Sequence, residues 1–407
     1  MNPDFDTARA AFLAGLQSQQ AGRLDEAEAH YSASLAALPG RASTLTNLAA
    51  TLITLARPDE ALPLLAQVLA QDPADLQALA YRGLALASLQ RDTEALPCFE
   101  RVVQAGGANP AAWLQHALCL ARLNRPDAAL PSCQQVLDAE PDSAEAWALR
   151  GGLLKDLGQV QAAIEALRRA VALGANAGID TGIQRYLLAS LQGRGAPPQP
   201  PQAYVQGLFD GYAAGFEHHL LHTLRYRAHT VLTEAVAGAV ARRGRPFQSA
   251  LDLGCGSGLC GAALRPQVQA LHGVDLSPAM LQQAAARDVY DTLTLADVAT
   301  HLQSTAQRHD LVLAADVFIY IGDLEAVFAG VRRVLLPGGR FGCSVEQADD
   351  AADWLLQPSA RYAQSARYLR TLARRHGFTL LQMAPGAVRH EQQQPVAGLY
   401  AWLEAPT

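Results

Sequence analysis

The first half of this 407-residue chain repeats itself every 34 residues, over about residues 8 to 176. Two positions define the period, and each holds a small residue in all five copies. The two series are Ala27, Ala61, Ala95, Ala129 and Ala163, and Gly15, Ala49, Gly83, Ala117 and Gly151. Small residues at fixed points allow the two helices of a hairpin to approach closely, and prolines at 39, 73 and 141 end the second helix of their copies. The period predicts five stacked helical hairpins, because one such hairpin cannot bury its apolar face alone.

The pattern resembles the tetratricopeptide repeat (TPR). Trp113 and Trp147 stand at its signature tryptophan position, which holds aliphatic residues in the other three copies. The resemblance implies a right-handed superhelix whose concave face binds peptides or partner proteins. The amphipathic segment 179–191 is expected to cap the last repeat, which gives a TPR domain over residues 1–192. An equally open interpretation is a scaffold that only orients or dimerises the rest of the chain.

A Gly/Pro-rich stretch, residues 193–202, cannot continue a helix and predicts a linker. Residues 203–407 then form a second domain, as the length of the chain requires. The net charge of −6 and a pI near 6.0 give no electrostatic footprint for nucleic acid. No run of ~18 apolar residues predicts a membrane span, and the amino terminus lacks signal-peptide features, so a cytoplasmic protein is expected. The six cysteines form no Cys-x-x-Cys pair, which favours buried reduced thiols.

The first candidate site in the second domain is an apolar run that ends in Gly254, Gly256 and Gly258. Glycines at two-residue spacing between a strand and a helix allow a tight turn to bring bare backbone against a nucleotide-like ligand. A dinucleotide fingerprint needs its third glycine where Leu259 stands, and a P-loop needs a Gly-Lys pair that the sequence lacks. The alternative is a glycine-rich turn without a ligand.

With Asp252 before it and Asp275 closing the next strand, this loop resembles motif I of class I S-adenosylmethionine-dependent methyltransferases. The resemblance implies S-adenosylmethionine as cofactor, ribose hydroxyls on Asp275, and the adenine amino group on Asp297 with a backbone contact from Val298. It implies the following cofactor-binding residues: Asp252, Gly254, Cys255, Gly256, Gly258, Asp275, Leu276, Asp297, Val298 and Asp316. The fold expected is an α-solenoid (TPR superhelix) followed by an α/β Rossmann-like, seven-stranded methyltransferase domain.

Residues 309–322 read as a buried parallel strand followed by a turn, where open α/β sheets place their ligands. Asp316 and Tyr320 are therefore predicted to face the reacting centre and are the candidate catalytic residues. His219 and Glu346 are further candidates for a general base. Methyl transfer is an in-line displacement, so a base is needed only where the acceptor holds its proton too tightly.

The segment before the glycine loop resembles a group of TPR-containing methyltransferases in which one helix covers the cofactor pocket. The matching residues are Phe209, Asp210, Tyr212 and Phe216. Aromatic residues at helical spacing are also compatible with a plain core. In a later matching segment, Gln364 replaces the usual histidine. His218 and His222 stand four apart, but nothing in the sequence completes a metal site with them, and none is expected.

The sequence thus predicts a methyltransferase whose TPR domain recruits or orients a protein or other acceptor. Two alternatives stay open. One is a TPR adaptor with a methyltransferase-like domain that binds cofactor without catalysis. The other is a small-molecule methyltransferase that uses its repeats to form oligomers. Neither the acceptor atom nor the oligomeric state follows from the sequence.

Overall fold

A computed structural model describes residues 3–106, 109–210, 215–391 and 393–407 of the chain. The chain divides into two compact units, Met1–Thr181 and Gly182–Thr407. Each unit has its own core and is described by itself.

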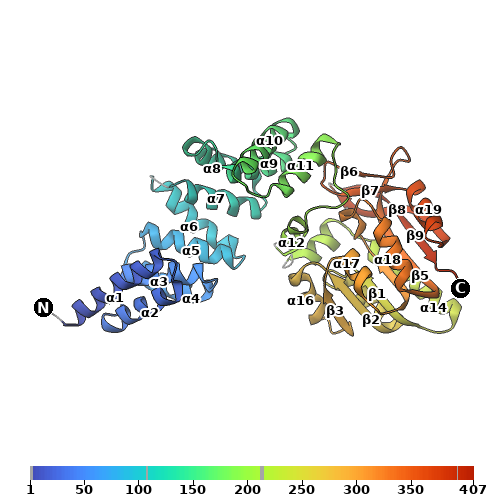
Figure 1. The fold of residues 1–407 in the computed structure, drawn as a ribbon, viewed down its shortest axis with the longest axis horizontal. Helices are drawn as coiled ribbons and strands as arrows, with labels where there is room; N and C mark the ends of the chain where they lie inside the picture. Colours follow the sequence, from blue (N-terminus) through green and yellow to red (C-terminus); the bar gives the residue numbers. More distant parts are fainter. Residues whose placement is uncertain (1–2, 107–108, 211–214, 392) are drawn as a thin grey trace. The chain divides into compact units, whose positions relative to one another are not determined.

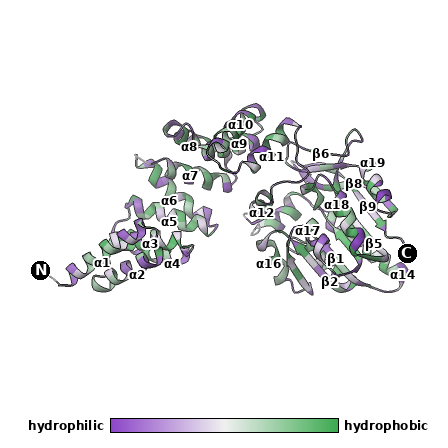
Figure 2. Ribbon diagram, viewed as in Figure 1, coloured by the Kyte–Doolittle hydropathy of each residue, from purple (hydrophilic) through white to green (hydrophobic). Residues whose placement is uncertain are grey.

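The first unit consists, over its described residues, of ten α-helices arranged as five consecutive hairpins (Figure 1). The helices are α1 (Pro3–Gln20), α2 (Leu24–Ala37), α3 (Ala42–Thr54), α4 (Pro58–Gln71), α5 (Leu76–Ser88), α6 (Asp92–Gln104), α7 (Pro110–Arg122), α8 (Pro126–Ala139), α9 (Ala144–Asp156) and α10 (Val160–Asn176). Each helix carries both hydrophobic and hydrophilic residues (Figure 2), as expected for elements that are buried on one side. The predicted five-hairpin repeat is confirmed.

The small residues of the period lie where the two helices of a hairpin meet. Ala27 and its four counterparts are all fully buried. A Cβ added to Gly15 would lie 2.6 Å from the ring of Tyr31, and one added to Gly83 would lie 2.8 Å from the ring of Phe99. A side chain at these positions would therefore push the paired helices apart.

The period also appears in polar contacts at the helix ends. Asp75, Asn109 and Ser143 directly precede α5, α7 and α9, and each side chain accepts a backbone N–H three residues later. Such N-caps satisfy donors that a helix leaves unpaired in its first turn. The repeat thus fixes the starts of these helices as well as their packing.

The second unit alternates helices and strands. Its helices are α11 (Gly182–Gln192), α12 (Gln202–Asp210), α13 (Phe216–His218), α14 (Ala228–Arg243), α15 (Leu259–Leu264), α16 (Pro278–Ala286), α17 (Val298–Ser304), α18 (Glu325–Val334) and α19 (Ala366–Arg375). Its strands are β1 (Phe247–Leu253), β2 (Val268–Asp275), β3 (Thr292–Leu295), β4 (His309–Ala314), β5 (Leu335–Ala348), β6 (Trp354–Leu356), β7 (Tyr362–Ser365), β8 (Thr379–Glu391) and β9 (Gln394–Glu404). Short helical turns, η2 (His219–Thr223), η3 (Arg265–Gln267) and η4 (Phe318–Tyr320), connect some of them.

One sheet contains all nine strands of the described residues. Seven of them follow the order β3-β2-β1-β4-β5-β9-β8, in which the first five run parallel and β9 is antiparallel to both β5 and β8. The other two, β6 and β7, form an antiparallel pair, and β7 joins the last residues of β5. The predicted seven-stranded sheet is confirmed, with this pair of strands added to it.

Helices cover both faces of the sheet, as in other α/β folds. One core includes residues of α17, α18 and α19, among them Leu302, Phe328 and Leu372. The core on the other face includes Val236 of α14 and Leu264 of α15. The carboxyl ends of the parallel strands meet at one edge, and the site described below lies there.

The boundary between the units differs from the expected one. Helix α11, predicted to cap the repeats, belongs to the second unit. Its Tyr186 is 1% exposed, packs in a cluster with Leu356 and Tyr362, and donates its hydroxyl to the Ala360 carbonyl at 2.7 Å. The amphipathic pattern showed correctly that this helix needs an apolar partner, but that partner is the region around β6 and β7.

The Gly/Pro-rich stretch is also part of the second unit. The Pro198 carbonyl accepts the backbone N–H groups of Gly322 (2.8 Å) and Asp323 (3.1 Å), and the Pro197 carbonyl accepts the Tyr362 hydroxyl (2.7 Å). These contacts hold residues 197 and 198 beside the turn that follows β4. The stretch predicted as a stiff linker between two domains is therefore a strap that packs on the second unit.

Candidate active site

The glycine loop follows β1 and has the backbone that its composition predicts. Gly254, Gly256 and Gly258 have φ angles of 61°, 54° and 89°, in the left-handed region that favours glycine. A Cβ on Gly254 would lie 2.6 Å from Val317 Cγ2, whereas a Cβ on Gly256 would meet nothing within 4 Å. The loop thus packs against the protein at Gly254 and presents open backbone at Gly256. Bare backbone beside open space fits a bound nucleotide-like ligand.

Asp275 closes β2 directly beside this open backbone. Its two oxygens accept the backbone N–H groups of Gly256 (2.8 Å) and Ser277 (2.9 Å). Burial raises the pKa of Asp275, while the backbone N–H groups that it accepts act in the opposite direction. A carboxylate has about four accepting positions, more than these backbone donors occupy, so Asp275 keeps capacity to accept a ribose hydroxyl.

Asp252 lies behind the glycine loop. It is 1% exposed and accepts the Tyr290 hydroxyl at 2.7 Å. Burial raises the pKa of Asp252 to about 7, with a smaller contribution of the same sign from the Asp275 charge. Cys255 is buried too, and its N–H donates to the Val274 carbonyl at 3.0 Å. Asp252 and Cys255 therefore hold the loop in shape, and their direct contact with a cofactor stays a prediction.

Three predicted cofactor residues follow β2 and β3. The Leu276 carbonyl accepts Gln206 Nε2 of α12 at 3.3 Å. Asp297 is the N-cap of α17 and accepts the Thr300 N–H at 3.0 Å through Oδ1. Val298 is buried as the first residue of that helix. Capping commits one Asp297 oxygen, so recognition of the adenine amino group would fall to Oδ2.

Aromatic side chains from α12 and α13 extend to the turn after β4. The ring centroids of Phe209 and Phe216 lie 5.9 Å apart, and those of Phe209 and Tyr320 lie 5.4 Å apart, both edge to face. Asp210 of α12 accepts the hydroxyl of Ser277, the N-cap of α16. These contacts attach the predicted lid to the turn after β4 and to the start of α16, which follows β2. Tyr212, the remaining residue of the lid pattern, lies outside the described residues.

Asp316 follows β4 in an unusual conformation. Its φ of 61° is left-handed, which costs energy for any residue with a Cβ, and its N–H donates to Ser344 Oγ at 2.8 Å. Burial raises the pKa of Asp316, Arg389 lowers it, and Glu346 raises it again. Burial also raises the pKa of Tyr320. The turn thus presents a partly desolvated carboxylate, on a residue with a strained backbone, next to Val317, the residue that contacts the glycine loop.

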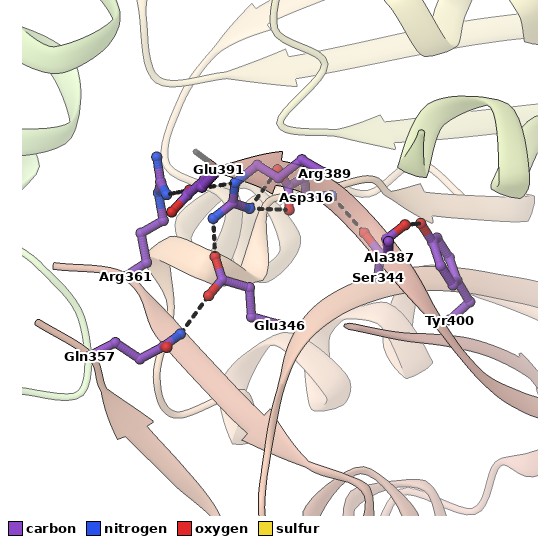
Figure 3. Close-up of polar contacts among 9 residues, drawn as sticks. All are labelled: Asp316, Ser344, Glu346, Gln357, Arg361, Ala387, Arg389, Glu391 and Tyr400. Carbon is purple, nitrogen blue, oxygen red and sulfur yellow. Dashed lines mark hydrogen bonds and ion pairs between the residues drawn. The ribbon is translucent and has the colours of Figure 1, made fainter. Parts of the chain in front are cut away.

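Asp316 belongs to a group of five charged side chains, the Arg389 cluster (Figure 3). Its members are Asp316, Glu346, Arg361, Arg389 and Glu391. The Arg389 side chain is 2% exposed and contacts three carboxylates: Asp316 at 3.4 Å, Glu391 at 2.9 Å, and Glu346. Arg361 pairs with the same Glu391, and Gln357 Nε2 donates to Glu346. A buried arginine is stable only with such partners, so these groups form one electrostatic unit.

Arg389 and Glu391 were not predicted from the sequence. Both lie near the end of β8, which returns to the carboxyl edge of the sheet because it runs antiparallel to β9. The indication available in the sequence was a pair of oppositely charged residues two positions apart, Arg389 and Glu391. Gln364, noted as a departure from the related group, is fully buried and donates to the Phe318 (3.1 Å) and Ile321 (2.7 Å) carbonyls. It therefore fixes the turn after β4.

Other features of the chain add no chemistry to the site. The rings of His218 and His222 lie 4.7 Å apart. Within the described ranges, no three His, Cys, Asp or Glu residues are grouped so that they could hold a metal ion. The six cysteines are unpaired and buried, as expected. A search of the same residues finds no helix with the length and apolar character to cross a membrane.

The fold and the site together define a class. A mostly parallel sheet, with a glycine loop after its first strand and an acid closing its second, is a Rossmann-like arrangement that places a nucleotide-like cofactor at its carboxyl edge. Comparison with protein families agrees: residues 251–341 match a methyltransferase domain, and residues 18–87 and 114–178 match tetratricopeptide repeats. The chain thus combines TPR repeats with a methyltransferase domain whose cofactor is S-adenosylmethionine, as predicted.

Similar proteins cover only parts of this chain. The malonyl-[acyl-carrier protein] O-methyltransferase of Salmonella typhimurium is 33% identical over 117 residues, which are 28% of this chain and 46% of that protein. Methyltransferase-like protein 27 of Homo sapiens is 38% identical over 104 residues, 25% of this chain and 41% of that protein. The chain therefore spans less than half the length of these curated relatives.

Among solved structures, MamA has 18% identity and a TM-score of 0.39 over 42% of this chain and 94% of its own. The N-methyltransferase NodS from Bradyrhizobium japonicum, in complex with S-adenosylhomocysteine, has 18% identity and a TM-score of 0.35. That alignment covers 44% of this chain and 87% of NodS.

Proposed function

We propose that this protein transfers a methyl group from S-adenosylmethionine to a protein or peptide acceptor that its TPR repeats recruit. The observation that carries the proposal is the arrangement around Val317. On one side this residue contacts the glycine loop at Gly254, and on the other it follows the strained Asp316. The cofactor loop and a partly buried carboxylate therefore adjoin at one edge of the sheet.

The chain's own residues suit each part of this task. S-adenosylmethionine supplies an electrophilic methyl group on a sulfonium. The loop at Gly256 and the carboxylate of Asp275 would bind the cofactor, and Asp297 with Val298 would lie at its adenine. Phe209 and Tyr320 would exclude water from the reacting groups. Such positioning in a dry site supplies most of the acceleration in an in-line displacement.

Asp316 is the residue best placed to receive a proton. Its side chain is 12% exposed, so it is accessible at the strand ends, while burial keeps its pKa raised. A base with a raised pKa is more effective near neutral pH than an ordinary carboxylate. Tyr320 follows in the same turn and would orient the acceptor.

The TPR unit supports recruitment of a macromolecule, because five stacked hairpins form an extended surface far larger than a small metabolite needs. Two other interpretations predict different results. An adaptor without catalysis would bind the cofactor and methylate nothing. A small-molecule enzyme would place label in low-molecular-weight products and need its repeats only for assembly.

The cofactor site is tested by calorimetry with S-adenosylmethionine and its demethylated product. Asp275→Ala should weaken binding about ten- to hundredfold, the equivalent of ~1.5–3 kcal/mol for a lost charge-assisted contact. Equal binding by the variant, or none by the folded wild-type protein, would contradict the assignment.

The function is tested by incubating the full chain, or residues 182–407 alone, with labelled S-adenosylmethionine and cell lysate. We expect label in a protein band with the full chain only, while both forms bind the cofactor equally. Undiminished labelling by the shorter form would refute recruitment by the repeats. If labelling tracks the loss of a dimer, measured in parallel, then assembly is the role of the repeats.

A further inference from the structure

The Arg389 cluster lies at the place where an acceptor would meet the cofactor. Asp316 and Glu346 come from the carboxyl ends of β4 and β5, and Arg389 and Glu391 come from the end of β8 at the same edge. Val317 links the cluster to the glycine loop through Gly254. The hydrogen-bonding groups that remain unused in the cluster therefore limit which kind of methyl acceptor can bind there.

The arginines of the cluster are already engaged. Arg389 uses all three of its nitrogens: Nε contacts Glu391, Nη1 contacts Asp316, and Nη2 contacts Glu346. Its side chain is 2% exposed and cannot reach a ligand without leaving these partners. Arg361 is tied to Glu391 and faces Tyr320. An incoming carboxylate would have to displace carboxylates of the protein from Arg389, and at Arg361 it would have to compete with Glu391.

The acids, in contrast, retain accepting capacity. Arg389 lies 3.4–3.5 Å from both oxygens of Asp316, which is long for a charge-assisted hydrogen bond. The Glu391 side chain is 36% exposed, and both arginines contact the same one of its oxygens. Asp316 and Glu391 therefore offer hydrogen-bond acceptors to a ligand.

The charge of the cluster leads to the same conclusion. Three carboxylates face two guanidinium groups, so the cluster has one net negative charge when Asp316 is ionised and none when it is protonated. In neither state is it positive. A second anion placed here would meet like charge in a poorly solvated site, whereas a cation or a neutral donor would be stabilised.

We infer that the methyl acceptor is a hydrogen-bond donor, an amine or a hydroxyl group, and not a free carboxylate. In the transfer, a lone pair on the acceptor nitrogen or oxygen forms the new bond to the methyl carbon. The S–CH₃ bond breaks, and its electron pair stays on sulfur as the neutral thioether. The acceptor's proton leaves to Asp316, and where the acceptor binds as an ammonium this proton leaves before the attack, because only the neutral amine has a lone pair. The inference narrows the proposed function and rests on it for the transfer step, but not for the binding preference.

The first test uses the chemistry of the product. Protein labelled from methyl-labelled S-adenosylmethionine and lysate is treated with mild alkali, which hydrolyses methyl esters to volatile methanol and leaves methylamines and methyl ethers intact. We expect the label to stay on the protein. Release of the label as methanol would overturn the inference while leaving the methyltransferase function standing.

The second test does not need turnover. The full chain, loaded with S-adenosylhomocysteine, is titrated with phenethylamine and with 3-phenylpropionate, and binding is followed by saturation-transfer NMR. We expect the amine to bind at least about tenfold more tightly, which corresponds to ~1.4 kcal/mol. Glu391→Gln and Asp316→Asn should each reduce that preference. Asp353→Asn, an exposed carboxylate paired with Arg367, is the matched control and should leave it unchanged.

The outcomes separate the two proposals. Preferential binding of the amine without any methylation would support the inference and contradict the proposed function. Binding of 3-phenylpropionate as tightly as the amine, or of neither probe, would overturn the inference. Loss of the preference in Asp353→Asn as well would also overturn it, because the effect would then not belong to the cluster.

Discussion

Mild acid should destabilise the second unit through His309. This residue begins β4, is fully buried, and has its Nδ1 2.8 Å from Ser249 Oγ. Its Nε2 has no hydrogen-bond partner among the described residues. Burial, followed by the positive charges of His272 and His301, lowers the pKa of His309 to about 4, while the charge of Asp310 acts in the opposite direction.

The sign of the effect follows from proton linkage. The folded state holds the His309 proton less tightly than the unfolded chain, whose histidine pKa is about 6.5. Between about pH 6.5 and pH 4 the unfolded state therefore binds more protons, and the free energy of unfolding falls as the pH falls. A pKa difference of about 2.5 corresponds to ~3 kcal/mol at 1.36 kcal/mol for each pKa unit. That is a large share of the stability of an ordinary domain.

Hydrogen exchange of β1 and β4 in the full chain, corrected for intrinsic exchange rates, measures this loss. In His309→Asn most of the loss between pH 6.5 and pH 4.5 should disappear, although the variant is less stable at neutral pH. His222→Gln changes an exposed histidine and should behave as the wild type. If His309→Asn kept the wild-type pH dependence, another group would be responsible and the assignment would be wrong.

Two further substitutions test the packing of each unit. Tyr290→Phe removes the hydroxyl that Asp252 accepts and leaves a buried carboxyl without that donor; we expect a loss of ~1–3 kcal/mol in urea unfolding, and an unchanged midpoint would contradict it. Gly83→Val places a side chain against the ring of Phe99 and should destabilise the repeats by ~1–3 kcal/mol. Circular dichroism reports the change, and Phe99→Leu should recover part of it if overpacking is the cause.

Local patterns made much of this molecule predictable. The 34-residue period contains the packing of each hairpin, because Ala27 and Gly15 act on neighbours within their own copy. The glycine loop and Asp275 were recognisable for a similar reason: the chain brings them together through one strand–helix–strand unit, and the Gly256 N–H donates to Asp275.

The parts that sequence reasoning missed depend on distant segments. Arg389 meets Asp316 and Glu346 only because β8 and β5 reach the same edge of the sheet through β9. No periodicity encodes such a meeting. Helix α11, whose packing partner was predicted wrongly, is a second example. Hydrophobic spacing shows that one face of a helix will be buried, whereas the residue that it packs against, here Tyr362, follows only from the complete fold.

The position of α11 leads to the last prediction, which concerns where the second unit begins. A chain of residues 182–407 should be more stable than one of residues 203–407. The shorter chain lacks Tyr186, which is 1% exposed, and its hydrogen bond to Ala360. It also lacks the strap carbonyl of Pro197 that accepts the hydroxyl of Tyr362.

The size of the loss can be worked out from these contacts. Burial of one large side chain contributes ~1.5–3 kcal/mol, and each of the two hydroxyl hydrogen bonds contributes about 0.5–1.5 kcal/mol. The shorter chain should therefore lose at least about 2.5 kcal/mol, enough to lower its melting temperature by several degrees. Tyr186→Ala in the full chain should reproduce much of the loss, whereas Tyr204→Ala, which keeps the helix and the strap, should cost less. Equal melting temperatures for the two truncated chains would show that α11 and the strap do not stabilise the sheet, and would return the boundary to residue 192.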